Sequence, residues 1–323
     1  MPFLILGSVL LVLCVAILLI SRWVYTKAFY VPDHKKPGDP RDFYSVGKDA
    51  IYRDALIALV DELEPRPYEA VSITSHDGLT LTGRYYHTAD GAPLKFIFHG
   101  WRSNVLRDCG GGAKMAFDAG YNLLLVNQRA HGDSGGNTLT FGIKEKYDCL
   151  DWVNYATRRF GKDVKIILGG ISMGAATVLM ASALELPENV KCISADCGYT
   201  SPEAIIRKVC REDMKIPDTL GFPFVRLGAR LFGKFSIIDG GAVEAVKHAK
   251  IPLMIMHGSA DDFVPYTMCH EIYNAIPGKK VLFTVEGAGH GMCYFAKTEE
   301  YAKTLLQFES DALNQASDEE APH

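Results

Sequence analysis

The chain carries little positive charge, and none of it is clustered. Its 34 lysines and arginines are outnumbered by 38 acidic residues, which gives a formal net charge of −4 over 323 residues. Proteins that bind DNA or RNA concentrate basic side chains on one face or along one stretch. No such stripe occurs here, so we exclude nucleic acid as a partner. Internal repeats and low-complexity segments are also absent from the sequence.

Motifs for nucleotides and metals are missing as well. The glycine run 110–112 is accompanied by neither G-x-x-x-x-G-K-S/T nor G-x-G-x-x-G, so we interpret it as the flexible start of a helix. The chain has no C-x-x-C pair and no H-E-x-x-H pattern. His99 and His257 each precede a glycine at the end of a predicted strand, where we expect them to support a site. We predict no cofactor and no metal.

The cysteines lack the spacing of a disulfide framework. They stand at positions 14, 109, 149, 192, 197, 210, 269 and 293. Cys149 and Cys192 fall in segments with helix and strand patterns, where a thiol is typical core material. Reduced cysteines are the better interpretation, and they favour a reducing compartment.

A long apolar run opens the sequence. Residues Phe3 to Ile20 include no charged side chain, and Trp23 and Tyr25 follow where a membrane interface would lie. About 18 to 20 such residues in a helix span the hydrocarbon core of a bilayer. The alternative is a cleavable secretory signal, but no lysine or arginine precedes the run and no small-x-small site follows it. We predict a retained single-pass anchor over residues 1–27.

Positive charge lies on one side of this anchor. The basic residues nearest to it all follow it, at Arg22, Lys27, Lys35, Lys36 and Arg41. Because basic residues tend to stay on the cytoplasmic side, we expect the remainder of the chain in the cytoplasm.

The segments that flank the central part of the chain differ from it in pattern. Residues 28–69 form a juxtamembrane segment, in which apolar residues at helical spacing between Ala50 and Leu63 predict one amphipathic helix packed on the domain. Residues 310–323 are acidic and rich in small side chains, so we expect a flexible, solvated tail.

Residues 70–309 predict one α/β domain. A period-two hairpin at the start is followed by short apolar runs that alternate with helical patterns. The runs are Lys95 to Phe98, Asn122 to Asn127, Val164 to Leu168, Lys191 to Asp196, Pro252 to His257 and Lys280 to Val285. This alternation indicates a mostly parallel, eight-stranded sheet with helices on both faces and the hairpin at one edge. The long connection at about 199–250 predicts a small helical cap over the carboxyl ends of the strands.

The pattern Gly170-x-Ser172-x-Gly174 stands between one of these strands and an apolar helix. Glycines two positions before and after Ser172 allow the strand and helix to approach closely, while the serine is held in a strained turn with its hydroxyl exposed. This strand-turn-helix context predicts a nucleophile elbow with Ser172 as the nucleophile.

A serine hydroxyl needs a base, and the base needs an orienting group. His290 lies among glycines directly after the last strand, and we predict it to be the base. Asp261 and its neighbour Asp262 follow the preceding strand, and either carboxylate fits the orienting role. The order Ser, Asp, His is that of hydrolases built on an α/β sheet.

The negative charge that develops on a substrate carbonyl requires N–H donors. The backbone N–H of Met173, directly after the nucleophile, is one candidate for this oxyanion hole. The loop His99 to Asn104 follows an early strand, and Gly100 lets its backbone turn inward. We therefore assign the second donor to the N–H of Trp101.

Six motifs together resemble the α/β-hydrolase superfamily. They are H-G-W-x-S-N at 99–104, N-Q-R-A-H-G-D-S at 127–134, G-I-S-M-G at 170–174, D-C-G-Y-T-S at 196–201, H-G-S-A-D-D-F-V-P at 257–265 and G-A-G-H-G at 287–291. The resemblance covers about residues 70–308 and is nearest to membrane-anchored bacterial serine hydrolases of the aminopeptidase-like and esterase-like groups. It implies the α/β-hydrolase fold and gives the acidic role to Asp261 through G-x-x-D-x-x-V-P. It also implies that Arg129 and Asp133 are structural ion-pair or hydrogen-bond partners.

These observations predict a serine carboxylic-ester hydrolase with a Ser172–His290–Asp261 triad and a small-molecule substrate. Apolar residues of the cap, Phe222, Phe224, Phe232 and Phe235, suggest a preference for apolar acyl or alcohol groups. A peptidase, thioesterase or acyltransferase with the same triad is the alternative; charged cap residues would then anchor a peptide terminus, and Glu203, Arg207, Arg211 and Glu212 are the candidates. A membrane-tethered binding protein is a third hypothesis, disfavoured by the complete catalytic set.

Overall fold

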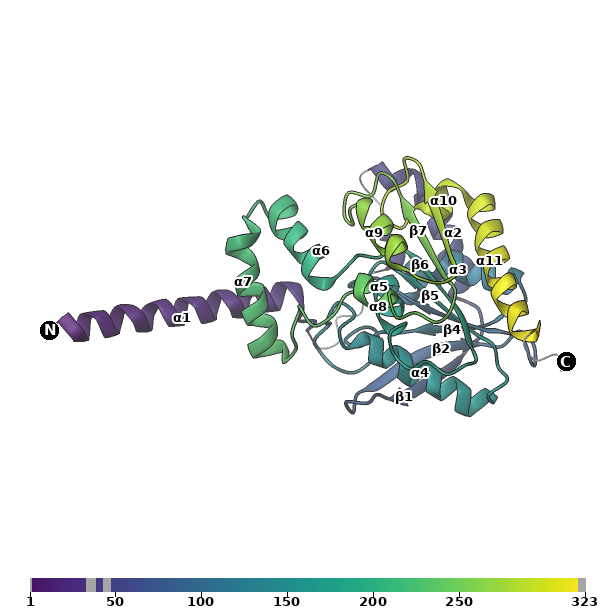
Figure 1. Ribbon diagram of the computed structural model, residues 1–323, viewed down its shortest axis with the longest axis horizontal. Coiled ribbons are helices and arrows are strands. Elements are labelled where there is room, and N and C mark those ends of the chain that lie inside the picture. Colours follow the sequence, from purple (N-terminus) through teal and green to yellow (C-terminus); the bar gives the residue numbers. More distant parts are fainter. Residues whose placement is uncertain (1, 33–38, 43–47, 319–323) are drawn as a thin grey trace.

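Eight strands form one sheet in the order β1-β2-β4-β3-β5-β6-β7-β8 (Figure 1). The computed structural model describes residues 2–32, 39–42 and 48–318. The strands are β1 (Glu69–Thr74), β2 (Thr80–Tyr86), β3 (Leu94–Phe98), β4 (Asn122–Val126), β5 (Ile166–Ile171), β6 (Val190–Asp196), β7 (Leu253–Gly258) and β8 (Lys280–Val285). β2 pairs antiparallel with both of its neighbours, β1 and β4. All other neighbouring strands are parallel. The predicted mostly parallel, eight-stranded sheet is confirmed.

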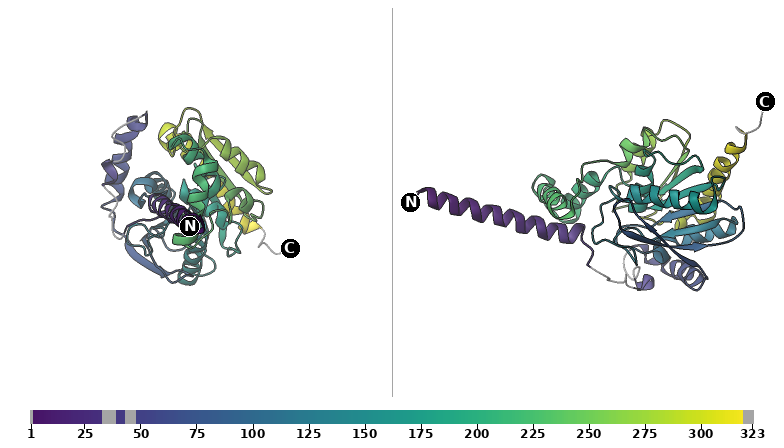
Figure 2. Two further views of the ribbon diagram at one scale, coloured as in Figure 1. Left: turned by 90° about the vertical axis from the view of Figure 1, so that its left-hand side faces the viewer. Right: turned by 90° about the horizontal axis from the view of Figure 1, so that it is seen from below.

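Helices cover both faces of this sheet (Figures 1 and 2). They are α1 (Pro2–Ala28), α2 (Arg53–Leu63), α3 (Val105–Asp118), α4 (Glu145–Phe160), α5 (Met173–Ala181), α6 (Pro202–Lys208), α7 (Asp218–Gly228), α8 (Ala242–Val246), α9 (Thr267–Ala275), α10 (Cys293–Ala296) and α11 (Thr298–Asp318). Side chains of α4, α5, α8 and α9 share one core with the sheet, and those of α2, α3, α10 and α11 share the other. Because the central strands are buried on both faces, their sequences are apolar throughout rather than alternating.

The helix predicted between Ala50 and Leu63 is present as α2, preceded by a short 3₁₀ turn, Lys48–Tyr52. Its apolar stripe, Leu56, Val60 and Leu63, is buried in the core that α3 shares. This segment therefore packs on the domain, as its amphipathic pattern predicted.

Two expectations about local structure are wrong. The glycines 110–112 do not start a helix; they lie in the middle of α3, which begins at Val105. Residues 310–318 are not a solvated tail, because α11 continues to Asp318 and buries Ala312 and Leu313 against the domain. These two apolar side chains pack this part of α11 on the domain although their neighbours in the sequence are polar or acidic. Residues 319–323 of the expected tail lie outside the described residues.

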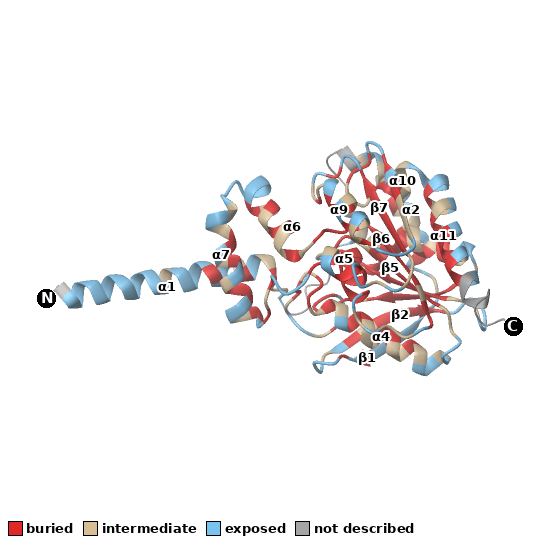
Figure 3. Cartoon of the chain, viewed as in Figure 1, coloured by how far each residue is buried: buried red, intermediate tan, exposed pale blue. Residues whose placement is uncertain are grey.

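α1 projects from the domain as a single long helix (Figures 1 and 2). Over Phe3–Ala28 it is long and apolar enough to cross a membrane, and its first two thirds contact no other part of the described chain closely enough to bury a side chain (Figure 3). Its C-terminal end is different, since Ser21 and Tyr25, together with Phe29 just beyond it, are buried.

The insertion between β6 and β7 is helical, as predicted, and part of its apolar surface packs against α1. α7 and the π-helical turn Ala229–Gly233 lie beside the end of α1 (Figure 1). Phe222 and Phe235 are buried in one cluster with Tyr25 and Phe29, and the Phe29 and Phe235 rings lie edge to face at 5.2 Å. The same cluster includes Met173 and the partly buried Trp101, which follow the carboxyl ends of β5 and β3. The expectation that the cap phenylalanines line the binding site is wrong, because none of them is among the described residues of the cavity wall.

Candidate active site

Ser172 occupies the turn between β5 and α5, where the elbow pattern placed it. Its backbone φ is 55° and its ψ is −114°, a conformation that is strained for a residue with a side chain. The flanking glycines explain how the chain reaches it: a Cβ atom on Gly170 would overlap the Gly174 carbonyl, and one on Gly174 would overlap the Phe98 carbonyl. The strand and helix therefore pack backbone to backbone around the serine.

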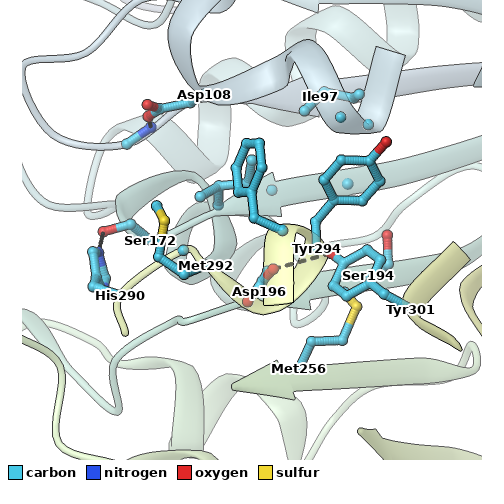
Figure 4. Close-up of a pocket in the computed structure, with 18 of the residues that line it drawn as sticks. Ile97, Asp108, Ser172, Ser194, Asp196, Met256, His290, Met292, Tyr294 and Tyr301 are labelled. Carbon is cyan, nitrogen blue, oxygen red and sulfur yellow. Dashed lines mark hydrogen bonds between the residues drawn. The ribbon is translucent and has the colours of Figure 1, made fainter. Parts of the chain in front are cut away.

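The loop after β8 brings His290 to this turn (Figure 4). His290 Nε2 lies 2.9 Å from Ser172 Oγ, and its Nδ1 lies 2.7 Å from Asp261 Oδ2. A carboxylate only accepts hydrogen bonds, so Nδ1 carries the proton and Nε2 is left to accept the serine hydroxyl proton. The three side chains thus form one continuous hydrogen-bonded chain from three separate loops.

Asp261 is held as an anion. Its Oδ1 accepts the backbone N–H groups of Phe263 and Val264 at 2.9 and 2.8 Å, and His257 Nε2 lies 3.2 Å from Oδ2. Burial alone would raise the pKa of Asp261, but the hydrogen bonds from His257 and His290 outweigh it and hold the pKa well below its usual range. From its place before a glycine at the end of a strand, the sequence predicted that His257 supports a site. It did not predict that His257 contacts Asp261.

Asp262 does not share this position. Its backbone carbonyl accepts a hydrogen bond from Lys208 Nζ at 2.7 Å, which ties the loop to α6. The geometry therefore agrees with the choice of Asp261 as the residue that contacts the histidine.

In the loop after β3, the backbone N–H groups on either side of Trp101 already donate hydrogen bonds within the protein. Gly100 N–H donates to Asp108 Oδ2 at 2.7 Å, and Arg102 N–H donates to His131 Nε2 at 3.0 Å. Within the part of the chain that the structure describes, neither Trp101 N–H nor Met173 N–H has a hydrogen-bond acceptor. Both N–H groups belong to segments that contact Ser172 or adjoin it, as an oxyanion hole requires.

A buried pair of histidines supports this loop; sequence reasoning expected a supporting role for His99 but none for His131. The rings of His99 and His131 lie 4.7 Å apart, edge to face. His99 Nδ1–H donates to the Gly100 carbonyl, and His131 Nδ1–H donates to the Arg129 carbonyl, both at 2.9 Å. Each ring is therefore held neutral with its other nitrogen accepting a backbone N–H, from Gln128 and Arg102 respectively.

His76, Asp77 and Asp148 come together closely enough to suggest a metal site. The Arg129 guanidinium, however, donates to both carboxylates, at 2.6 Å to Asp148 and 3.0 Å to Asp77. The cluster is an ion pair, which confirms a structural role for Arg129. Its partner is not Asp133, which is exposed, because the carboxylates of α4 and the β1–β2 turn reach the guanidinium instead.

A cavity of about 320 Å³ begins at Ser172 and His290 and runs between the sheet and the helices α3, α10 and α11 (Figure 4). Its lining is mostly apolar and includes Ile97, Met115, Met256, Tyr294 and Leu305. Gly111 and Gly112 of α3 also line it, and a Cβ on either would crowd Tyr294 or Ile97. No residue of the insertion 199–250 is among the described residues of the wall.

Part of the chain matches a family model. A family model described as the alpha/beta hydrolase fold matches residues 96–225, a segment that spans β3 to α7 and includes Ser172. Together with the strand order and the structural neighbours described below, this match shows that the chain has the alpha/beta hydrolase fold.

Two curated relatives are similar over most of their length. The uncharacterized protein YqkD of Bacillus subtilis is 25% identical over 258 residues, which cover 80% of this chain and 84% of that protein. The uncharacterized protein YfhR of Escherichia coli K12 is 21% identical over 264 residues, covering 78% of this chain and 84% of that protein.

Solved structures with the same fold include esterases. Esterase Pf2001 of Pyrococcus furiosus superposes with a TM-score of 0.63 at 23% identity, covering 76% of this chain and 93% of that chain. Est1E of Butyrivibrio proteoclasticus, solved with ferulic acid, has a TM-score of 0.57 at 21% identity, covering 76% of this chain and 100% of its own. At this level of identity the likeness shows the fold alone.

Proposed function

We propose that this protein is a serine hydrolase that cleaves carboxylic esters through an acyl-enzyme. The observation that carries the proposal is the hydrogen-bonded chain Ser172–His290–Asp261, with spacings of 2.9 and 2.7 Å, on a strained turn. The esterases among the structural neighbours support the same reaction class.

The mechanism follows from the positions of the polar atoms. Ser172 Oγ attacks the acyl carbon while its proton passes to His290 Nε2, and the ionised Asp261 stabilises the resulting imidazolium. The N–H groups of Trp101 and Met173 bind the oxyanion of the tetrahedral intermediate. His290 then gives the proton to the leaving alcohol, and a water molecule repeats the sequence on the acyl-enzyme.

An apolar acyl or alcohol group remains part of the proposal, but its binding site changes. The cavity wall of Ile97, Met115, Met256 and Leu305 replaces the cap phenylalanines as the surface that would bury it. Each methylene group that is moved from water into the cavity contributes about 0.8 kcal/mol of favourable binding free energy. Longer chains should therefore be preferred until the cavity is full.

The peptidase alternative loses its proposed anchors. Arg207 pairs with Glu203 and Asp218, and Arg211 pairs with the same Asp218, so these charges neutralise one another within the insertion. None of them lies in the cavity wall that begins at Ser172. We therefore keep ester hydrolysis as the main proposal.

Replacing the serine tests the proposal. In full-length protein reconstituted in lipid nanodiscs, we expect turnover of p-nitrophenyl esters to fall at least about 10⁴-fold in Ser172→Ala. Labelling by a fluorophosphonate probe should disappear in the same variant, since the probe bonds covalently to an activated serine.

Ser259→Ala is the matched control, because this serine is exposed and its hydroxyl oxygen accepts a hydrogen bond from the Gly287 N–H rather than from a triad residue; this variant should retain both signals. Ester turnover that survives in Ser172→Ala would contradict the triad. Faster cleavage of aminoacyl p-nitroanilides than of any ester would favour the peptidase, and a folded protein silent on both substrates and on the probe would favour a binding role.

We also propose that α1 is a retained membrane span with the domain on the cytoplasmic side. The sequence after the apolar run supports retention, because it offers no small-x-small cleavage site. The basic residues that follow the span support the orientation.

A further inference from the structure

The cavity wall contains one carboxylate that the proposed mechanism does not use. Asp196, the last residue of β6, lies between the catalytic serine and the tyrosines of the inner wall (Figure 4) and is only 4% exposed. Its Oδ2 accepts a hydrogen bond from the Tyr301 hydroxyl at 3.0 Å. Its Oδ1 has no partner among the residues that the structure describes.

This acceptor is unusual for a buried group. A carboxylate offers about four acceptor positions, and only one is used at Asp196. Nearly all buried polar atoms in folded proteins are bonded, so an unpaired carboxylate oxygen calls for an explanation such as a ligand. Burial raises the pKa of the Asp196 carboxyl, as expected where donors are too few to compensate.

The sheet register places Asp196 near the nucleophile rather than at the far end of the cavity. Asp196 pairs with Ile171, the residue before Ser172, and its carbonyl accepts the Ser172 N–H at 2.8 Å. Ser194, which also lines the cavity, is two residues earlier on β6 and hence about 6.6 Å deeper. A group bound at Asp196 therefore sits only a few atoms from the carbonyl that Ser172 attacks.

The charges nearby decide what kind of group this is. The one lysine in the wall, Lys95, is paired with the buried Glu309 at 2.6 Å, so its charge is already neutralised. Glu309 Oε2 also has no partner within the described chain. With Asp196 ionised, the three groups sum to one negative charge, which disfavours an acidic substrate and favours a hydrogen-bond donor.

We propose that Asp196 is a specificity residue that accepts a hydrogen bond from a hydroxyl or ammonium group on the substrate. The natural ester would then carry such a donor on the arm that enters the cavity, a few carbons from the scissile carbonyl. This inference rests on the proposed function, because it takes the ligand to be an ester whose carbonyl lies at Ser172.

Paired esters test this assignment in the full-length protein in lipid nanodiscs. The probes are p-nitrophenyl hexanoate and the same ester with a terminal hydroxyl or a terminal ammonium group. We expect kcat/KM for at least one donor-bearing ester to exceed that of hexanoate by about tenfold or more, the value of one hydrogen bond to a charged group. The comparison between hydroxyl and ammonium identifies which donor the site takes.

Asp196→Ala should reduce this preference to about one, and Asp196→Asn, which keeps the volume of the side chain, should reduce it partly. Met256→Ala is the matched control, because Met256 pairs with Asp196 across β6 and β7 and lines the same cavity with an apolar group. It should lower turnover of all three esters by a similar factor and leave the preference intact. A wild-type preference of about one for both donors, or a preference unchanged in Asp196→Ala, overturns the assignment.

A binding measurement separates this inference from the proposed function. In Ser172→Ala, which cannot turn the ligand over, methyl esters of the donor-bearing acids should raise Tm more than methyl hexanoate does. The difference should vanish in the Ser172→Ala, Asp196→Ala double variant. If the donor-bearing esters give the larger Tm shift in Ser172→Ala but the wild type shows no Ser172-dependent turnover, ester hydrolysis is contradicted and the donor site is supported. Equal Tm shifts for all ligands contradict the donor site.

Discussion

His99 shows how a single buried residue sets the loop that carries the Trp101 N–H. Both of its ring nitrogens are engaged, Nδ1 as a donor to the Gly100 carbonyl and Nε2 as an acceptor of the Gln128 N–H. A second proton has no acceptor in this arrangement. Burial and the neighbouring His131 together lower the pKa of His99 to about 3.

This shift predicts a loss of stability in acid. Between pH about 6.5, where an unfolded histidine titrates, and pH about 3, the unfolded chain binds a proton at His99 that the folded chain does not. The free energy of unfolding should therefore fall with decreasing pH in this window, by up to about 1.4 kcal/mol per pH unit from this residue. Chemical denaturation at a series of pH values measures the slope.

His99→Gln should flatten that slope, since glutamine does not titrate. His248→Gln, at an exposed histidine, is the control and should leave the slope as in the wild type. Equal slopes in the two variants would show that His99 is not the group responsible.

At the scale of elements, the contact between α1 and α7 decides where the insertion lies. Gly228, at the end of α7, lets the two helices approach so closely that a Cβ atom there would lie 2.5 Å from the Ser21 carbonyl oxygen. Tyr25 packs on the same surface, and its hydroxyl shares a hydrogen bond with Thr138 Oγ1 at 2.6 Å. The insertion and the helix that precedes the domain therefore form one packed unit.

A larger side chain should separate them. In Gly228→Ile we expect the packing to weaken by about 1–3 kcal/mol, because the helices must move apart. Limited trypsin proteolysis at the exposed Lys215 should then be roughly tenfold faster than in the wild type. Gly278→Ile is the control, since a Cβ there meets no atom within 4 Å. Unchanged cleavage in Gly228→Ile would mean that the contact does not hold the insertion.

At the scale of the whole molecule, the end of α1 is joined to the loop of the candidate oxyanion hole. Arg102 Nη2 donates to the carbonyls of Lys27 and Tyr30 at 2.9 and 3.0 Å, and Trp101 Nε1–H donates to the Ala28 carbonyl at 3.3 Å. If α1 spans a membrane, the candidate site is held at a set distance from the bilayer surface rather than on a loose tether.

The orientation of the domain is testable with a cysteine at an exposed position. The seven cysteines of the domain are all buried, so the native thiols do not report topology. Lys162→Cys places a thiol in an exposed turn. We expect an impermeant maleimide to label it only after the cells are permeabilised, with the wild type as the unlabelled control. Strong labelling of Lys162→Cys in intact cells would place the domain outside the cytoplasm.

Much of the fold was predictable because its signals are local. Strands such as β3 and β4 are buried on both faces, so their continuous apolar sequences identify them without knowledge of the rest of the fold. The glycines around Ser172 indicate a tight turn, because a side chain at either position would overlap the neighbouring backbone. The last turns of α11 escaped prediction, because the burial of Ala312 and Leu313 depends on a distant surface of the sheet.

The sequence by itself predicted the sheet, the turn at Ser172 and the candidate residues Ser172 and His290, since each depends on residue types at short spacing. The choice of Asp261 over Asp262 came from the family resemblance. Tertiary structure alone decided what surrounds them. Phe222 and Phe235 of the insertion pack with the end of α1, and the cavity wall comes instead from α3, α10, α11 and the sheet, which carries Asp196 into it. The physical reason is that a side chain takes the partner that buries it best, and that partner is brought near only by the folded chain.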